Sequence, residues 1–273
     1  MKMMRRTIFL TVASFLSTAA FGQNLPFKPE DAVSISDTAN LVAHCSTFAF
    51  HGARDMYFAY YQDSEQKKEY SAILSTFPVL AKVDRVTGKV SYRKDVIKAG
   101  ETIGDFTHGP RAPYDPNVLV LGKTLMMYFN GCVGTEVTYC ARPFDLRTET
   151  FEDRIVVCKL RYVTPWGELK TVDLSAENTF KFFEDNSIPA KYHNDLCISA
   201  RFIPYRGEYY SVLCNVFTDE SKPVVVKTSD GVNFDVVMIC RDFEWGACEA
   251  SLEIVDDQFY VAMRNSGCPK EER

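Results

Sequence analysis

The chain has 273 residues, of which 46% are hydrophobic, 13% aromatic and 25% charged. This mixture is typical of a packed globular protein and excludes a disordered chain, a collagen-like chain and a coiled coil. The formal net charge is −5 and no long basic block occurs, so the phosphate attraction that dominates nucleic-acid binding has no obvious source. We therefore expect no nucleic-acid partner.

The N-terminus has the pattern of a secretory signal peptide, residues 1–22. Positive charges precede a short apolar run, and small residues fit cleavage near Gly22-Gln23. The apolar run is shorter than the ~20 residues that a membrane-spanning helix needs. The sequence therefore predicts a secreted or periplasmic protein with no membrane span in its mature form. An approach segment at 23–40 then leads into one domain at 41–273.

Nine cysteines follow the signal peptide, in a compartment that permits disulfides. None forms a C-x-x-C pair and the four histidines are scattered, so we expect no metal site and no cofactor. Cys132 and Cys140 flank a short segment that contains glycine, and a disulfide can bridge such a loop. Cys158, Cys214 and Cys240 lie in apolar runs, where we expect buried thiols.

Short runs rich in Val, Ile, Phe and Tyr alternate with turn signals along the chain, which indicates an all-β protein. Helix is a minor component, with one short candidate at 174–183. Four segments repeat the order strand, tight turn, strand: 45–61, 115–129, 199–213 and 249–263. Such repeats fit the two inner strands of successive blades, so the sequence predicts a β-propeller. A β-sandwich made of the same hairpins is the alternative.

In a propeller, the residue that opens each inner strand faces the central funnel. In the four segments these residues are Cys45, Asp115, Ser199 and Glu249. Glycosidic-bond cleavage commonly needs one carboxylic acid to protonate the leaving oxygen and a second group to attack or to activate water. Asp115 and Glu249 are therefore candidate catalytic residues. Taken singly, such residues more often cap a turn or form an ion pair at a rim.

The segment 228–234 matches the Asp-box pattern, Ser/Thr-x-Asp-Gly-x-x-aromatic. It predicts a hairpin turn in which Thr228 and Asp230 bind backbone amides. Gly231 then takes a positive φ, and Phe234 covers the sheet edge. We expect this segment to be structural and not catalytic.

Glu249 opens one strand and Arg264 ends the next, so a hairpin places both on the same face of the propeller. Together with the Asp-box, this pattern resembles the sialidase superfamily of six-bladed propellers. The resemblance implies that Glu249 polarises a tyrosine nucleophile and that Arg264 binds the carboxylate of sialic acid. A guanidinium suits that ligand because it offers two parallel charge-assisted bonds. It also implies an incomplete propeller, with four to five blades.

The sequence departs from the sialidase pattern in two places. The strand around Cys45 lacks the first arginine of that family, and Arg111, just before Asp115, is better placed to supply it. His108 lies in the same approach, and we assign His108 and Arg111 to substrate binding. The chain also ends soon after Arg264, before the strands that carry the last arginine and the tyrosine in that family.

Residues 115–129 also resemble a blade opening of five-bladed furanosidases and arabinanases. That resemblance implies Asp115 as general base, Glu249 as general acid and Asp195 as a third carboxylate in the substrate site. The sequence thus predicts a secreted glycoside hydrolase of sialidase-like type that cleaves terminal sugars, sialic acid among them, from glycans. The alternatives are the furanosidase-like enzyme and a catalytically inactive propeller that binds glycan.

Overall fold

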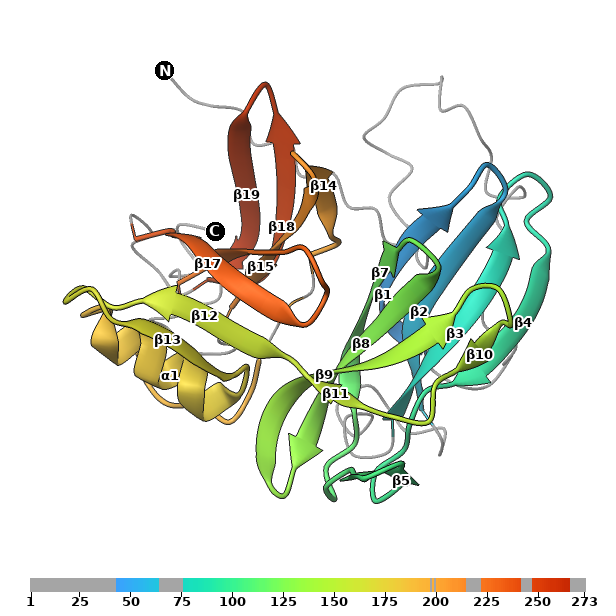
Figure 1. Ribbon diagram of the computed structural model, residues 1–273, viewed down its shortest axis with the longest axis horizontal. Coiled ribbons are helices and arrows are strands. Elements are labelled where there is room, and N and C mark those ends of the chain that lie inside the picture. The colour runs from blue at the N-terminus through green and yellow to red at the C-terminus, as the bar shows by residue number, and fades with distance from the viewer. Residues whose placement is uncertain are drawn as a thin grey trace.

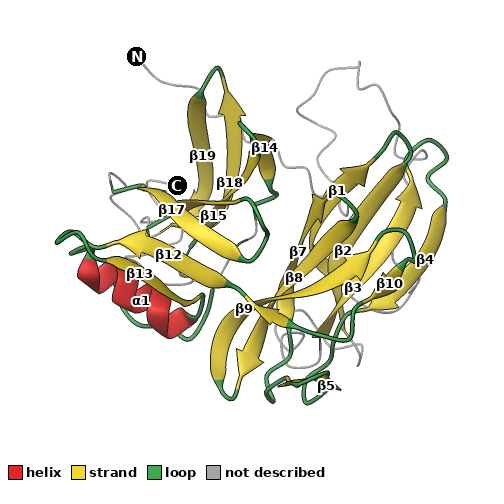
Figure 2. Cartoon of the chain, in the orientation of Figure 1, coloured by secondary structure: helices red, strands yellow, loops and turns green. Residues whose placement is uncertain are grey.

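The computed structural model describes residues 43–63, 76–196, 198, 200–214, 222–241 and 247–265. The expected signal peptide and approach segment lie outside these residues. Most of the described chain is β-strand, with the short helix α1 (Ala176–Asp185) (Figure 2). This helix begins after Ser175, whose side chain accepts the amide of Asn178 as an N-cap. No helix in the described ranges is long and apolar enough to span a bilayer.

Four main sheets follow one another along the chain (Figure 1). The first contains β1 (Ala43–His51), β2 (Asp55–Asp63), β3 (Thr76–Asp84) and β4 (Val90–Asp95). The second contains β7 (Tyr114–Leu121), β8 (Thr124–Val133), β9 (Glu136–Asp145) and β10 (Thr150–Phe151), with β11 (Val156–Val157) paired to β9. Between them in sequence lies a small hairpin of β5 (Thr102–Ile103) and β6 (Phe106–Thr107).

The third sheet has, in spatial order, β14 (Ile203–Tyr205), β15 (Glu208–Leu213), β16 (Val224–Thr228), β17 (Asn233–Ile239), β12 (Lys159–Val163) and β13 (Leu169–Asp173). The hairpin β12–β13 joins its outer edge through a parallel pair with β17. The fourth sheet is the hairpin of β18 (Ala247–Val255) and β19 (Gln258–Asn265). The four predicted hairpins are the first two strands of the four sheets, so this prediction is confirmed.

The sheets stack face to face in chain order, as the blades of a propeller do. In β8, alternation of side chains sends Met127 and Phe129 into the buried cluster with the first sheet, and Met126 and Tyr128 into the cluster with the third. A further cluster joins the third sheet to the fourth. Because the second and third sheets bury both faces, the fold is propeller-like and not a two-layer sandwich. The described blades form an open series (Figure 1).

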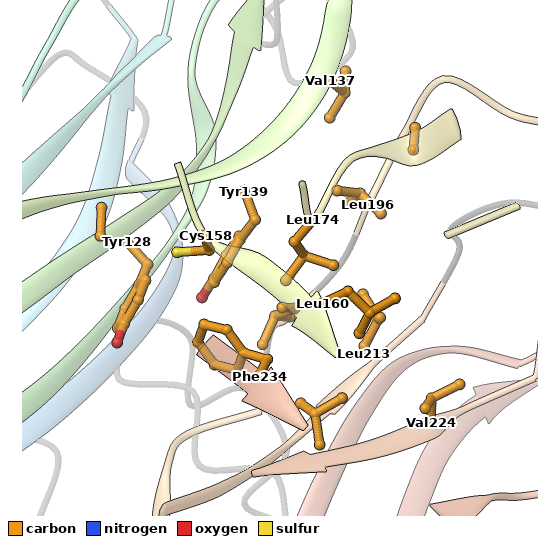
Figure 3. Packing of buried hydrophobic residues seen from close by; sticks show 14 of the residues in the cluster. Tyr128, Val137, Tyr139, Cys158, Leu160, Leu174, Leu196, Leu213, Val224 and Phe234 are labelled. Atoms are coloured by element: carbon orange, nitrogen blue, oxygen red, sulfur yellow. The ribbon is translucent and has the colours of Figure 1, made fainter. Parts of the chain in front are cut away.

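Aromatic rings fill the space between the second and third sheets (Figure 3). Tyr139 stacks on Tyr128 with ring centroids 5.2 Å apart, and Phe234 meets both rings edge-on. The Tyr128 hydroxyl donates to the carbonyl of Gly231 at 2.9 Å, which satisfies a buried polar group. Phe234 is fully buried, and because β17 pairs with both β12 and β16, its ring packs between the two sheets and does not cover a sheet edge as predicted.

The turn between the third and fourth strands of a sheet has the same side-chain hydrogen bonds in the first, second and third sheets. In each, an aspartate Oδ1 accepts the backbone amides two and three residues later; the aspartates are Asp84, Asp145 and Asp230. The Thr228 hydroxyl also accepts the amide of Gly231 at 2.8 Å, and the φ of Gly231 is +74°. The turn geometry predicted for residues 228–234 is therefore confirmed.

Replacing Asp230 with asparagine tests the turn. Burial raises the pKa of Asp230, but the hydrogen bonds from Asn233 and Val232 outweigh it, so the pKa lies below its ordinary value. The charged form therefore stabilises the fold above about pH 4, and this contribution is lost as the pH falls through the lowered pKa. We expect Asp230→Asn to reduce the free energy of unfolding by about 0.5–1 kcal/mol at neutral pH and by less near pH ~2.5.

Urea denaturation of Asp230→Asn at both pH values measures this difference. Asp256→Asn, at an exposed turn position, is the matched control and should change little at either pH. An equal loss for Asp230→Asn at both pH values would contradict the role of the charge.

The buried cysteines of the second blade lie on both faces of its sheet. Cys132, Cys140 and Cys158 are buried free thiols, and Cys214 is also buried. The prediction of buried thiols is thus confirmed for Cys158 and Cys214, whereas Cys240 is half-buried. Cys132 belongs to the cluster with the third sheet and Cys140 to the cluster with the first. A disulfide between Cys132 and Cys140 is therefore wrong, because their side chains leave the sheet on opposite faces.

Candidate active site

The two predicted catalytic carboxylates lie on matching irregularities of two inner strands. The pairing of β7 with β8 shifts register at residues 115–116, and that of β18 with β19 shifts at 249–250. Each shift is a β-bulge, in which one strand has an extra residue and the side chain at the bulge changes direction. Asp115 and Glu249 take the first position of these bulges, with φ of +47° and +50°. Strand β1 shifts register at the same place, between His44 and Thr47.

A positive φ is unfavourable for a residue that has a Cβ, by about 1–2 kcal/mol. The other described non-glycine residues with a positive φ lie in turns or just after the helix; they are Glu149, Ser187, Arg206, Asp256 and Asp257. Asp115 and Glu249 are thus the two cases that lie inside a strand of the described chain. Such conformations concentrate at functional sites, where the surrounding structure holds them.

Asp115 and Glu249 differ in their surroundings. Asp115 is half-buried, and its Oδ2 accepts the side-chain amide of Asn130 at 3.4 Å. Glu249 is exposed at the start of β18. The backbone of Arg264 lies opposite Cys248, next to Glu249, on the strand position that the sequence predicts. The side chain of Arg264 lies outside what the structure describes.

Asp195 lies in a buried network next to Asp115, with a side chain only 7% exposed. Its Oδ1 accepts the Tyr114 hydroxyl and the amide of Leu196, and its Oδ2 lies 3.5 Å from Nη2 of Arg111. Burial raises the pKa of Asp195, against the opposing effects of the Tyr114 hydrogen bond and the Arg111 charge. Burial also raises the pKa of Tyr114. These contacts tie Asp195 to the strand that carries Asp115, and its role in the substrate site stays a prediction.

The segment that leads into β14, which we call the strap, consists of residues 194–200 and is described at 194–196, 198 and 200. Its alternate carbonyls accept side-chain donors of the second sheet and of Arg111, which precedes it: Asn194 from Arg111 (2.7 Å), Leu196 from Asn130 (2.5 Å), and Ile198 and Ala200 from Asn117 (3.0 and 2.8 Å). Ala200 shares a buried cluster with Ala250, the residue after Glu249. The strap therefore runs from the residues that bond around Asp115 to the buried cluster that contains Ala250.

His108 is buried, at 2% exposure, and both ring nitrogens bind the backbone. Its Nδ1 donates to the carbonyl of Gly109 at 2.8 Å, and its Nε2 accepts the amide of Cys132 at 3.3 Å. Burial lowers the pKa of His108, in agreement with the neutral ring that these two bonds require. The contacts of His108 and of Arg111 are thus with the protein itself, and their roles in substrate binding stay predictions.

Two hollows in the described chain lie away from these residues. One, of about 440 Å³, lies at the far end of β7 between Leu121 and the turn at Asp230. Another, of about 330 Å³, lies beside the β5–β6 hairpin at Phe106. The described residues also contain no group of three or more His, Cys, Asp or Glu side chains placed to hold a metal ion. The candidate site rests instead on the positions of Asp115 and Glu249 at the bulges of β7 and β18.

Sequence reasoning missed three residues that bond to Asp115, Asp195 or the strap, namely Tyr114, Asn117 and Asn130. The sequence contains one signal for Asn130, because it is a polar residue inside the apolar run 125–132. Of the other strand-opening residues, Ser199 and the side chain of Cys45 lie outside the described residues.

No protein-family model and no curated protein sequence matches the chain. Solved structures do share its fold. Zg3597, a family 117 glycoside hydrolase from the marine bacterium Zobellia galactanivorans, has a TM-score of 0.51 at 10% identity, over 86% of this chain and 68% of its own. The Hadza microbial sialidase Hz136 has a TM-score of 0.51 at 11% identity, over 82% of this chain and 42% of its own.

A protein of unknown function from Dyadobacter fermentans has a TM-score of 0.55 at 12% identity, over 86% of this chain and 65% of its own. The chain thus spans less than half of the sialidase and about two thirds of the other two. At these identities the likeness shows the fold, which is a β-propeller of the type found in glycoside hydrolases.

Proposed function

We propose that this protein is a secreted glycoside hydrolase in which Asp115 and Glu249 supply the two carboxyl groups of the reaction. The observation that carries the proposal is their position on matching bulges of two inner strands, each with a positive φ. Elsewhere in the described chain such strain occurs at turns and at the helix end. Two carboxyl groups are what most glycosidases use, one as acid and one as base or nucleophile.

The surroundings suggest which carboxyl group does what. A side-chain amide donates to Asp115, and a donor favours the ionised form, as a base or nucleophile needs. Glu249, on the exposed start of β18, then protonates the leaving oxygen. A glycan substrate agrees with the fold, which a glycoside hydrolase and a sialidase share.

The contacts of Arg111 favour a neutral terminal sugar over sialic acid. Its guanidinium donates to the strap carbonyl of Asn194 and faces Asp195, so it is already engaged. A sialic-acid site needs several arginines directed at the substrate carboxylate. Arg264, beside Glu249, is the residue that would serve the sialidase-like alternative.

A substrate panel tests the proposal. We expect the mature protein to release the fluorophore from a furanoside or another neutral glycoside, and to leave a fluorogenic sialoside intact. Turnover of the sialoside alone would contradict this proposal and support the sialidase-like alternative. Glycan binding on an array without any turnover would contradict the enzyme and support the inactive, glycan-binding propeller.

A further inference from the structure

Asn130 is a fully buried polar residue in the apolar strand β8. Its Nδ2 donates to the strap carbonyl of Leu196 at 2.5 Å and to Oδ2 of Asp115 at 3.4 Å. Among the described groups, none bonds to its buried Oδ1. Burial of an unbonded carbonyl costs about 1–3 kcal/mol, and the bond from Nδ2 to the Leu196 carbonyl offsets part of this cost. The second contact of the same amide, with Asp115, connects Asn130 to the candidate site.

The orientation of the Asn130 amide is set by the strap. Exchanging its nitrogen and oxygen would bring Oδ1 against the carbonyl of Leu196, and two acceptors would then face each other. The donor therefore points to Asp115. The 3.4 Å separation is longer than a typical bond of about 2.9–3.0 Å. Hydrogen bonds at catalytic groups are often long without substrate and tighten when it binds.

We propose that Asn130 is a positioning residue that fixes the carboxylate of Asp115 in its reactive orientation. The inference rests on the proposed function, in which Asp115 is the base or nucleophile. The bulge takes Asp115 out of the regular pairing of β7 with β8, so the strand alone does not set the direction of its side chain. Asn130 links that carboxylate to the strap, which three side chains hold.

Asn117 offers a matched control for this role. It is the same residue type, is equally buried, and its side-chain amide donates twice to the strap, at Ile198 and Ala200. Both of its amide donors are thus used away from Asp115. Loss of Asn117 weakens the strap, whereas loss of Asn130 weakens the strap and also removes a donor to the carboxylate.

The test compares Asn130→Ala with Asn117→Ala in the full mature protein. One readout is kcat, KM and the pH–rate profile on the glycoside that the wild type hydrolyses. The other is the titration midpoint of the Asp115 carboxyl carbon, followed by NMR in protein labelled at aspartate, with Asp115→Asn assigning the signal. If Asn130→Ala does not fold, Asn130→Ser replaces it with the same readouts.

We expect Asn130→Ala to lower kcat on the order of 10-fold with little change in KM, because a misplaced carboxylate acts in the transition state. The acidic limb of the profile and the NMR midpoint should both rise by about 0.5–1 pH unit, since removal of a donor disfavours the charged form. Asn117→Ala should lower the melting temperature and leave the midpoint at its wild-type value. Equal midpoints in the two variants would overturn the inference.

The two readouts separate this inference from the proposed function. If the wild type hydrolyses no glycoside, the proposed function fails, and the NMR midpoint still decides whether Asn130 acts on Asp115. If the wild type is active and the midpoint of Asn130→Ala does not move, only the inference fails.

Discussion

Glu249→Gln is expected to lower kcat/KM for the glycoside substrate by about 10²–10⁴-fold and to leave the fold intact. Glutamine has the shape of glutamate but carries no proton to donate at this position. Because Glu249 is exposed, the substitution buries no new polar group and should not change the free energy of unfolding. The measurements are steady-state kinetics and urea denaturation of the variant beside the wild type.

Glu253→Gln is the matched control for this prediction. Glu253 lies on the same strand as Glu249, is exposed, and forms an exposed ion pair with Arg201. Such a pair contributes little to stability, so activity and stability should both stay near the wild-type values. Full activity of Glu249→Gln would remove Glu249 from the mechanism.

Asp115→Gly and Asp115→Ala are expected to be equally inactive but to differ in stability. Both remove the carboxylate, so turnover should fall by about 10²–10⁴-fold in each. At a φ of +47° glycine is relaxed and alanine is strained, so we expect the glycine variant to be the more stable by about 1 kcal/mol. Urea denaturation measures the difference.

Ser251 provides the control for backbone conformation. It lies in β18 just beyond the bulge, is exposed, and is absent from the positive-φ positions. There the order should reverse, with glycine less stable than alanine by about 0.5–1 kcal/mol. If the glycine variant is less stable than the alanine variant at position 115 as well, the bulge stores no strain. The positive φ of Asp115 would then give no support for a catalytic role.

Local pattern was enough to predict the hairpins and the turn at Asp230. Alternating apolar residues and turn signals placed the four hairpins, because both depend on residues close in sequence. The bonds of Asp84 and Asp145 to backbone amides in their turns were not predicted, since neither turn has the full Asp-box pattern. Threonine three residues after each aspartate is the signal that could have found them.

The bulges and the buried network could not be read from local pattern. A register shift depends on two strands at once, so nothing in residues 115–116 alone predicts a positive φ. Asp195 contacts Arg111 and Tyr114 across more than 80 positions of sequence, so no local pattern reveals that it is buried in this network. The Cys132–Cys140 pair failed for a related reason, because proximity in sequence does not reveal which face of a sheet each side chain leaves.

The most direct test of the central claim is a crystal structure of the Glu249→Gln variant with an uncleaved glycoside bound. We expect the side chains at positions 115 and 249 to contact the same glycosidic bond, with their carboxyl-derived groups about 5–9.5 Å apart, as in retaining and inverting glycosidases. A sugar bound away from both residues, or the two side chains too far apart to reach one bond, would contradict the account.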